Sequence, residues 1–340
     1  MKNINPSIES RLEKDKTKTK SLSYYVEGII DKKDHYVLSE SITMLESDQV
    51  IHKHISLQTL MACYEHRVPS FRYGITGSPG VGKSTFIDSI ASHFSNKDHH
   101  VGILTVDPSS TDGKGSILGD KTRMEELAKD KNIFIRPSPS NRHLGGLNQY
   151  TYESIILCEA AGKDRILIET VGVGQSEVDV SHHVDATILL VLPGGGDSLQ
   201  GIKKGVLEKA DLIIVHKSDG DAKRLAIDSA KEYKEAIHLR RHGGEIPVLN
   251  YSSITGEGRQ TITDALDKLV VAKKEELIAI RKKQEDRWLQ SRIKEYISEE
   301  VASKLEEEDI NQTIEQYDNS PFDRLSFVKN NVDISIRIKS

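Results

Sequence analysis

Residues 77–85 read Gly77-Ser78-Pro79-Gly80-Val81-Gly82-Lys83-Ser84-Thr85, a complete match to the pattern G-x-x-x-x-G-K-[ST]. An apolar run, RYGIT, precedes this stretch, and a segment with apolar residues at helical spacing follows it. A strand, a glycine-rich loop and a helix in this order form the context in which the pattern binds phosphate groups. The sequence therefore predicts a nucleotide-binding P-loop.

Each residue type in this stretch suits phosphate chemistry. Glycines allow the backbone to wrap around the phosphates, and the N–H groups at the start of the helix supply partial positive charge. Lys83 reaches the terminal phosphates, and the Ser84 hydroxyl is placed to ligate Mg²⁺. We therefore expect Lys83 to be indispensable for hydrolysis and Mg²⁺ to accompany the nucleotide.

On both sides of this loop, short β-rich runs alternate with helical segments from about residue 71 to residue 265. The expected strands are RYGIT, VGILTV, NIFIRP, RILIE, ATILLVL, DLIIVH and IPVLNY. This alternation predicts an α/β fold in which a mostly parallel P-loop sheet is flanked by helices.

Helical segments flank this predicted P-loop domain over residues 71–265. Apolar residues recur at helical spacing over residues 36–64, which predicts two helices within an N-terminal helical extension, residues 1–70. Residues 261–305 are highly charged with a broken apolar stripe and predict one or two long helices. A heavily charged helix with a narrow apolar stripe often packs on a partner chain or lies along its own domain. We therefore expect residues 266–340 to form a C-terminal helical arm and cap, and the arm to mediate a homodimer.

Two further predicted strands end in acids, VGILTV at Asp107 and RILIE at Glu169. The carboxyl ends of parallel strands meet at the edge that carries the P-loop, so both acids can orient Mg²⁺ or its waters. With Ser84 they form the expected metal-binding set, and with Lys83 the expected catalytic set. Gly172 can approach the terminal phosphate. Alternatively, each acid caps the turn that follows its strand.

The choice of base is predicted from two later loops. His216-Lys217-Ser218-Asp219 follows DLIIV, and Ser252-Ser253-Ile254 follows IPVLNY. A carboxylate at Asp219 can accept both N1–H and N2–H of guanine, and the N–H of Ser253 is positioned to meet guanine O6. His216 replaces the usual Asn and removes one amide that ties the loop down, which predicts a lowered affinity. A strand-ending turn without ligand is the alternative for the first loop alone, but the pair of loops favours guanine.

Composition excludes several other classes of protein. The 340 residues include 47 Lys and Arg against 52 Asp and Glu, a net charge of −5. Such a chain lacks the basic footprint of a nucleic-acid binder. With one Trp and 5% aromatic residues, it also lacks stacking platforms for single strands. We therefore expect no nucleic-acid partner.

Cysteine usage and hydropathy predict the compartment. Cys63 and Cys158 are far apart and form no C-x-x-C unit, as in proteins of a reducing compartment. The first twenty residues have no apolar stretch of the kind found in signal peptides. The most apolar run, residues 186–192, is far shorter than the roughly 18 residues needed to span a bilayer. These observations predict a soluble, cytoplasmic protein with no membrane partner.

The motifs of the chain together resemble those of one family. GxPGVGKST, VDPSS…GSILGDKTRM, RPSP…LGG, CEAAG, ETVGVGQSE, LPGGGDSLQGIKKG and KSDGD are similar to motifs of the methylmalonyl-CoA mutase-associated GTPases, the ArgK/MeaB family. The resemblance covers roughly residues 37–305. His216 and Ser218 depart from it, because they stand where the family usually has Asn and Ala.

The resemblance implies a P-loop GTPase that acts as a chaperone for an adenosylcobalamin-dependent acyl-CoA mutase. Such a chaperone gates cofactor loading and protects the mutase, and we expect the cobalamin to be bound by the mutase and not by this chain. The resemblance also implies three switch segments: residues 107–123 with Asp120, residues 169–177 with Gly172 and Gln175, and residues 193–205 with Asp197 and Lys203.

Two other functions stay open at the level of the sequence. A nickel or other metal-insertion GTPase is one, because three histidine pairs could supply imidazoles: His52 and His54, His99 and His100, and His182 and His183. No Cys accompanies them, so histidines on helix surfaces are the favoured interpretation. An amino-acid-transport-linked kinase is the other, although the sequence shows no dedicated acceptor pocket.

Overall fold

The computed structural model describes residues 20–107, 126–139, 147–170, 180–194, 207, 209–238 and 246–304. Contacts between residues divide the chain into two compact units, with the boundary between Gln284 and Glu285. The first unit contains every strand of the described chain and the predicted nucleotide-binding loops.

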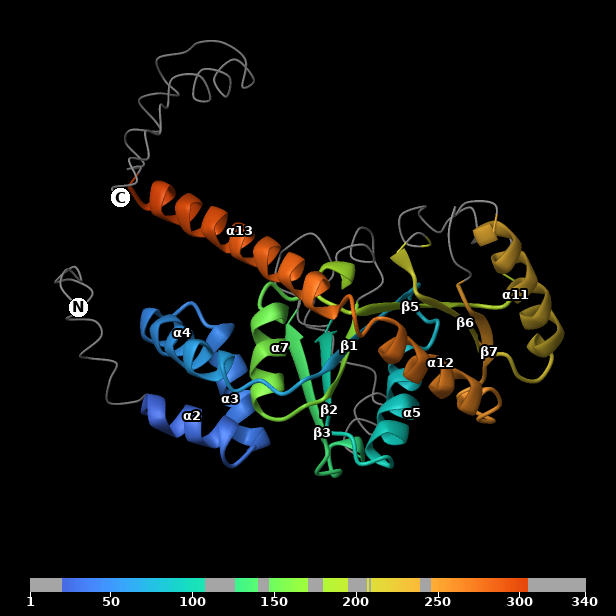
Figure 1. Cartoon of the computed structure of the whole chain (residues 1–340), viewed down its shortest axis with the longest axis horizontal. Helices are drawn as coiled ribbons and strands as arrows, with labels where there is room; N and C mark the ends of the chain where they lie inside the picture. The colour runs from blue at the N-terminus through green and yellow to red at the C-terminus, as the bar shows by residue number, and fades with distance from the viewer. Residues whose placement is uncertain are drawn as a thin grey trace, which may run out of the picture. The chain divides into compact units, whose positions relative to one another are not determined.

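A seven-stranded sheet forms the centre of the first unit, and every strand pair in it is parallel (Figure 1). Its strands are β1 (Phe71–Gly77), β2 (Val101–Asp107), β3 (Ile133–Pro139), β4 (Arg165–Glu169), β5 (Ala186–Val191), β6 (Leu212–His216) and β7 (Val248–Tyr251). They lie in the order β3-β2-β4-β1-β5-β6-β7. All seven coincide with the predicted apolar runs, and the predicted α/β fold with a parallel P-loop sheet is confirmed.

Helices cover both faces of the sheet, because alternate residues of each strand point to opposite faces. On one face, α5 (Lys83–Ser95) and α12 (Arg259–Ala272) pack on β1, β5 and β6. On the other face, α7 (Thr151–Ala160) packs over β2, β3 and β4. The remaining part of that face, formed by β5, β6 and β7, is covered by α11 (Ala222–His238). Strands buried on both faces read as continuous apolar runs, which is why the sequence shows them clearly.

Three helices precede β1 and pack with α7 in one apolar cluster. They are α2 (Leu22–Ile30), α3 (His35–Leu45) and α4 (Val50–Tyr64). The last two are the predicted pair, whereas α2 was not predicted. Ser21 caps α2 by accepting a hydrogen bond from the N–H of Tyr24. Gly28 lets α2 approach α3, because a Cβ there would lie only 2.6 Å from Cγ1 of Val37.

The start of α13 (Leu277–Lys304) is attached to the sheet by a buried cluster of charges. The Arg281 guanidinium lies 2.8 Å from Oδ2 of Asp185 and 3.3 Å from Oε1 of Glu159. Arg72 pairs with the same Glu159 oxygen at 2.8 Å and donates to Oε1 of Gln284 at 3.0 Å. Burial lowers the pKa of Arg281, but its hydrogen bonds and the charges of Asp185 and Glu159 outweigh burial and raise it. The arginine therefore stays charged within this cluster.

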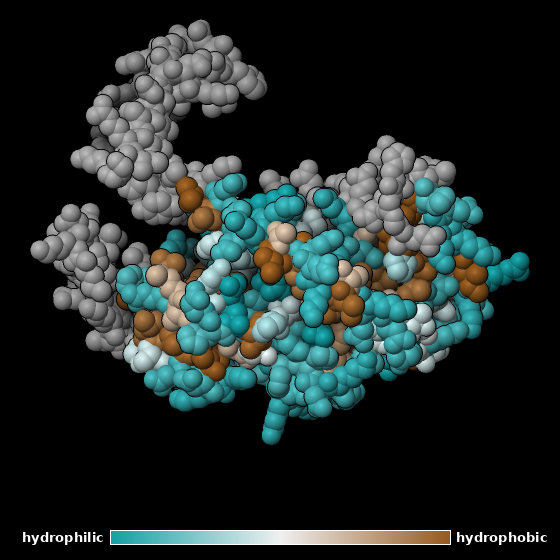
Figure 2. All heavy atoms as spheres, viewed as in Figure 1, coloured by the Kyte–Doolittle hydropathy of each residue, from teal (hydrophilic) through white to brown (hydrophobic). Residues whose placement is uncertain are grey.

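The surface of the described residues is mainly hydrophilic. Figure 2 shows hydrophobic side chains in small separate groups on the face in view. Exposed apolar residues include Leu57 and Met61 on α4 and Leu289 and Ile293 on α13. Within the described residues, no helix is long and apolar enough to cross a membrane.

Candidate nucleotide-binding site

The P-loop leaves the sheet at the end of β1, the central strand, with β4 and β5 as its neighbours. Its backbone takes conformations that favour glycine, with φ of +146° at Gly77, +76° at Gly80 and +99° at Gly82. A Cβ at Gly77 would lie 2.4 Å from the carbonyl oxygen of Leu190 in β5. The loop can therefore keep this path against β5 only with glycine at position 77.

The cation and the hydroxyl predicted to serve the phosphates lie on the first turn of α5. Lys83 is buried, and its Nζ donates to the carbonyl oxygens of Gly77 at 2.9 Å and Ser78 at 3.3 Å. The Ser84 Oγ donates to Oε1 of Glu169 at 3.2 Å. The structure thus brings three predicted site residues, Lys83, Ser84 and Glu169, to one edge of the sheet.

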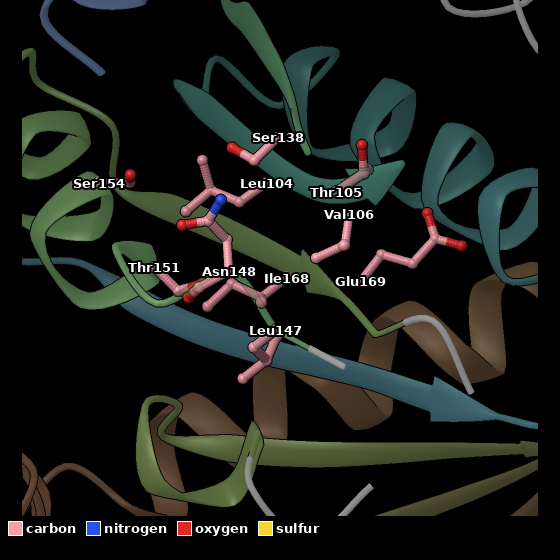
Figure 3. Close-up of a pocket in the computed structure, with 10 residues that line it drawn as sticks. All are labelled: Leu104, Thr105, Val106, Ser138, Leu147, Asn148, Thr151, Ser154, Ile168 and Glu169. Atoms are coloured by element: carbon pink, nitrogen blue, oxygen red, sulfur yellow. The ribbon is translucent and has the colours of Figure 1, made fainter. Parts of the chain in front are cut away.

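The predicted metal-binding acids end neighbouring strands. Glu169 is the last residue of β4, and Ile75 of β1 lies opposite it. Asp107 is the last residue of β2, which pairs with the edge of β4 that faces away from β1. Figure 3 shows a narrow pocket beside Glu169, whose carboxylate is directed away from Asn148 and Thr151. Hydroxyl and carboxylate oxygens are the ligands that Mg²⁺ prefers, and this ion takes only a few of them from protein. The donor set of Ser84 and Glu169 therefore fits Mg²⁺.

The two predicted base-recognition loops lie side by side. Ser252 joins them: its Oγ donates to Oδ1 of Asp219 at 2.9 Å and accepts from the N–H groups of Ile254 and Thr255. The N–H of Ser218 donates to the carbonyl oxygen of Tyr251 at 3.2 Å. Ile254 is 84% exposed. Asp219, the predicted acceptor for guanine, is thus held in place by the second loop.

The sequence predicted that His216, in place of the usual Asn, removes an amide that ties its loop down, but in the structure the imidazole itself ties the loop down. Its Nδ1 lies 2.6 Å from the carbonyl oxygen of Val81, and its Nε2 lies 2.7 Å from Oγ of Ser253. Lys217 adds a second tie, since its Nζ donates to the carbonyl oxygen of Gly80 at 2.8 Å. Lys217 adopts a left-handed conformation, with φ of +59°. An imidazole can therefore replace the amide as a link, which the sequence comparison with the usual Asn did not reveal.

Two residues that the sequence did not single out support this link. The ring of Tyr251, the last residue of β7, stacks on His216 with ring centroids 5.6 Å apart and an interplanar angle of 28°. Its hydroxyl lies 2.5 Å from Oγ of Ser89 on α5. The only available signal was the position of Tyr251, directly before the predicted loop Ser252–Ile254.

Five predicted switch residues lie outside the described residues: Asp120, Gly172, Gln175, Asp197 and Lys203. Asp107 is described as part of β2, and its side chain is not. The three switch assignments stay predictions from the sequence.

The histidine pairs do not form a metal centre within the described chain. Among those residues, no group of three or more His, Cys, Asp or Glu side chains is placed to hold a metal ion. His99 lies in the connection between α5 and β2 and not on a helix surface, with its Nδ1 2.6 Å from Oδ2 of Asp164. His183 is partly buried, and desolvation by the surrounding protein lowers its pKa to about 4. The thiols of Cys63 and Cys158 are free and buried, and burial raises the pKa of each to about 12.

Comparisons with known proteins agree with this geometry. The family model of the methylmalonyl Co-A mutase-associated GTPase MeaB matches residues 38–306. A probable GTPase of Mycobacterium tuberculosis (strain ATCC 25618 / H37Rv) is 44% identical over 275 residues, which cover 79% of this chain and 82% of that protein. The mitochondrial methylmalonic aciduria type A homolog of Mus musculus is 39% identical over 308 residues, covering 82% of this chain and 74% of that protein. A solved structure of a LAO/AO transport system kinase superposes with a TM-score of 0.70 at 30% identity, covering 97% of this chain and 94% of the other.

Proposed function

Because this chain belongs to the methylmalonyl Co-A mutase-associated GTPase MeaB family, we propose that it is a GTP-hydrolysing chaperone of an adenosylcobalamin-dependent acyl-CoA mutase. The GTPase activity agrees with the name of its Mycobacterium tuberculosis relative and with the P-loop fold. The mutase partnership is the new element. It is supported by the family description and by a mouse relative that is named after methylmalonic aciduria.

Different residues of the site are suited to the phosphates, to the guanine base and to the metal ion that accompanies GTP. The backbone of residues 77–85 surrounds the phosphates, and the Lys83 ammonium neutralises the charge that develops on them. The Asp219 carboxylate selects guanine. Ser84, with Glu169 and Asp107, would hold Mg²⁺, which would supply positive charge to neutralise the phosphates. Glu169 accepts a hydrogen bond from the Ser84 hydroxyl. The lone pairs of the Ser84 oxygen therefore stay free for the ion.

The glycine-rich segment 193–205 is our candidate for reporting the nucleotide state to the mutase. It follows β5, and its Asp197 and Lys203 are able to exchange partners as GTP is hydrolysed. Coupling between two sites requires contacts that differ between the two states, and charged side chains on a glycine-rich segment suit this role.

The decisive experiment measures GTP hydrolysis with and without the acyl-CoA mutase of the same organism. We expect the mutase to stimulate hydrolysis by the unaltered protein. Lys203→Ala is expected to blunt this stimulation and to leave GTP affinity within a few-fold. Lys209→Ala, at an exposed lysine four residues after the end of the segment, is the matched control. Absence of any stimulation in the unaltered protein would overturn the mutase proposal, and full stimulation in Lys203→Ala would remove the segment from it.

A transport-linked kinase is the second candidate, because a solved structure of a LAO/AO transport system kinase is similar over 97% of this chain. Product analysis separates the two functions. A GTPase releases inorganic phosphate from GTP in the absence of any acceptor, whereas a kinase accumulates a phosphorylated small molecule. We expect the first result, since phosphate release needs only the P-loop, the metal ligands and water.

A further inference from the structure

The hydrogen bonds of His216 define which of its nitrogens carries a proton. The carbonyl oxygen of Val81, 2.6 Å from Nδ1, can only accept, so Nδ1 must donate. Burial lowers the pKa of His216, which keeps the ring neutral near pH 7. The Nε2 of a neutral ring with a protonated Nδ1 is an acceptor, so the Ser253 hydroxyl, 2.7 Å away, donates to it. The ring therefore acts as a directed bridge from the second base-recognition loop to the P-loop.

Packing fixes the orientation of this ring. Tyr251 stacks on it, and the ring of Phe86 from α5 meets its edge, with centroids 6.4 Å apart at an angle of 80°. A Cβ at Gly82 would lie 2.6 Å from Cε1 of His216, so the glycine backbone is in direct contact with the imidazole. His216 is only 2% exposed. The ring therefore cannot turn without displacing the P-loop, α5 or β7.

We propose that His216 is a positioning residue for guanine recognition, which orients the N–H of Ser253 toward guanine O6 by holding the Ser253 hydroxyl from the P-loop side. The inference deepens the guanine site of the proposed function and rests on it, but it does not depend on the mutase. Asp219 and His216 then contribute to the recognition of different groups of the base. The carboxylate accepts hydrogen bonds from N1–H and from the amino group. The imidazole, by orienting Ser253, determines the strength of the hydrogen bond to O6.

Base analogues separate these two contributions. Inosine triphosphate keeps O6 and lacks the amino group, so the ratio of GTP to inosine triphosphate affinity reports on Asp219. The triphosphate of 2-aminopurine riboside keeps the amino group and lacks both O6 and the N1 proton. The ratio of GTP affinity to its affinity therefore responds to the Ser253 contact and to the Asp219–N1 contact together, and the inosine ratio shows whether the contribution of Asp219 has changed. A residue that only stabilises the fold would change the affinity for all three nucleotides equally.

Three variants test the proposal by titration of each nucleotide. His216→Phe retains an aromatic ring and loses both hydrogen bonds, and we expect the ratio of GTP to 2-aminopurine nucleotide affinity to fall about tenfold. The ratio of GTP to inosine triphosphate affinity should stay within about twofold, since Asp219 keeps its Ser252 partner. His216→Asn offers an amide N–H to Val81 and a carbonyl oxygen to Ser253, and it should restore the first ratio.

Ser253→Ala is the variant of choice if His216→Phe does not fold, because it removes a single hydroxyl from a half-buried loop. It should reproduce the selective loss. An unchanged ratio of GTP to 2-aminopurine nucleotide affinity in both variants, an equal loss for all three nucleotides, or no restoration by His216→Asn would overturn the proposal. Failure of the guanine site itself looks different, because the unaltered protein would then bind ATP as tightly as GTP.

Discussion

The role proposed for Asp219 in base selection predicts that its replacement changes which nucleotide is preferred. In Asp219→Asn, the amide can donate to the C2 carbonyl of xanthine, where the carboxylate would be repelled. We expect preference to shift from GTP to xanthosine triphosphate, measured by competition of the two nucleotides for binding. Asp221→Asn, at an exposed aspartate two residues later, is the control and should keep GTP preference. A variant that still prefers GTP would contradict the role of Asp219.

Two glycines of the P-loop should respond differently to the same substitution. A Cβ at Gly82 would collide with His216 at 2.6 Å, whereas one at Gly80 meets nothing within 4 Å. Gly80→Ala adds only the strain of a positive φ, about 1 kcal/mol, and Gly82→Ala adds the collision, for a total of about 3 kcal/mol. Urea unfolding followed by circular dichroism measures the difference. Equal losses in the two variants would mean that the imidazole can move away.

The position of some of these residues at one site could be predicted from the sequence, and that of others could not. The P-loop, Asp219 and the paired loop Ser252–Ile254 were identifiable, because their chemistry depends on residue types at fixed spacing. The link made by His216 was not, since it depends on Val81, which is 135 positions earlier in the chain. A pattern of side chains along the sequence does not show which carbonyl oxygen an imidazole will meet.

At the level of elements, burial decided what could be predicted. All seven strands were predicted, because burial on both faces makes them continuous apolar runs. The helix α2 was missed: it has nine residues and directly follows a Lys-rich stretch. All ten residues of α7 are buried, so no face of this helix is exposed to solvent. Its sequence therefore shows no alternation of apolar and polar residues at helical spacing.

The root of α13 yields a prediction about stability. Arg281→Met would leave Asp185, buried at 2% exposure, without its guanidinium, and breaking a buried ion pair in this way costs about 3 kcal/mol. Lys282→Met, at the exposed neighbour, should change the free energy of unfolding by less than about 0.5 kcal/mol. Urea unfolding of both variants tests this. A loss in Arg281→Met no larger than in the control would show that the cluster does not hold the helix.

The same cluster shows the limit of sequence reasoning for the molecule as a whole. Its members Arg72, Glu159, Asp185 and Arg281 come from four separate segments, and no local pattern connects them. Arg72 and Asp185 lie at the beginnings of β1 and β5, which the parallel sheet brings to one edge, and the end of α7 and the start of α13 add Glu159 and Arg281 there. Only the complete topology makes them neighbours.

The predicted homodimer is tested at the scale of the whole molecule. Leu289 and Ile293 lie one turn apart on α13 and are 46% and 49% exposed. If the arm mediates dimerisation, Leu289→Glu with Ile293→Glu should give monomers in sedimentation velocity, with GTP affinity unchanged. Gln290→Glu with Ser291→Glu adds the same charge on other faces of the helix and should keep the dimer. A monomeric unaltered protein, or a dimeric double-glutamate variant, would contradict the prediction.

The strand order also predicts which part of the sheet unfolds locally first. The amides of β1 are shielded from hydrogen exchange by strands on both sides, whereas β7 has four residues and a single neighbouring strand. The phosphate-binding loop therefore follows the central strand, where the sheet resists local unfolding most. The loop Ser252–Ile254 follows the edge strand, where the sheet resists it less. We expect the guanine base to be released before the phosphates, so that the edge of the sheet sets how long a nucleotide stays bound.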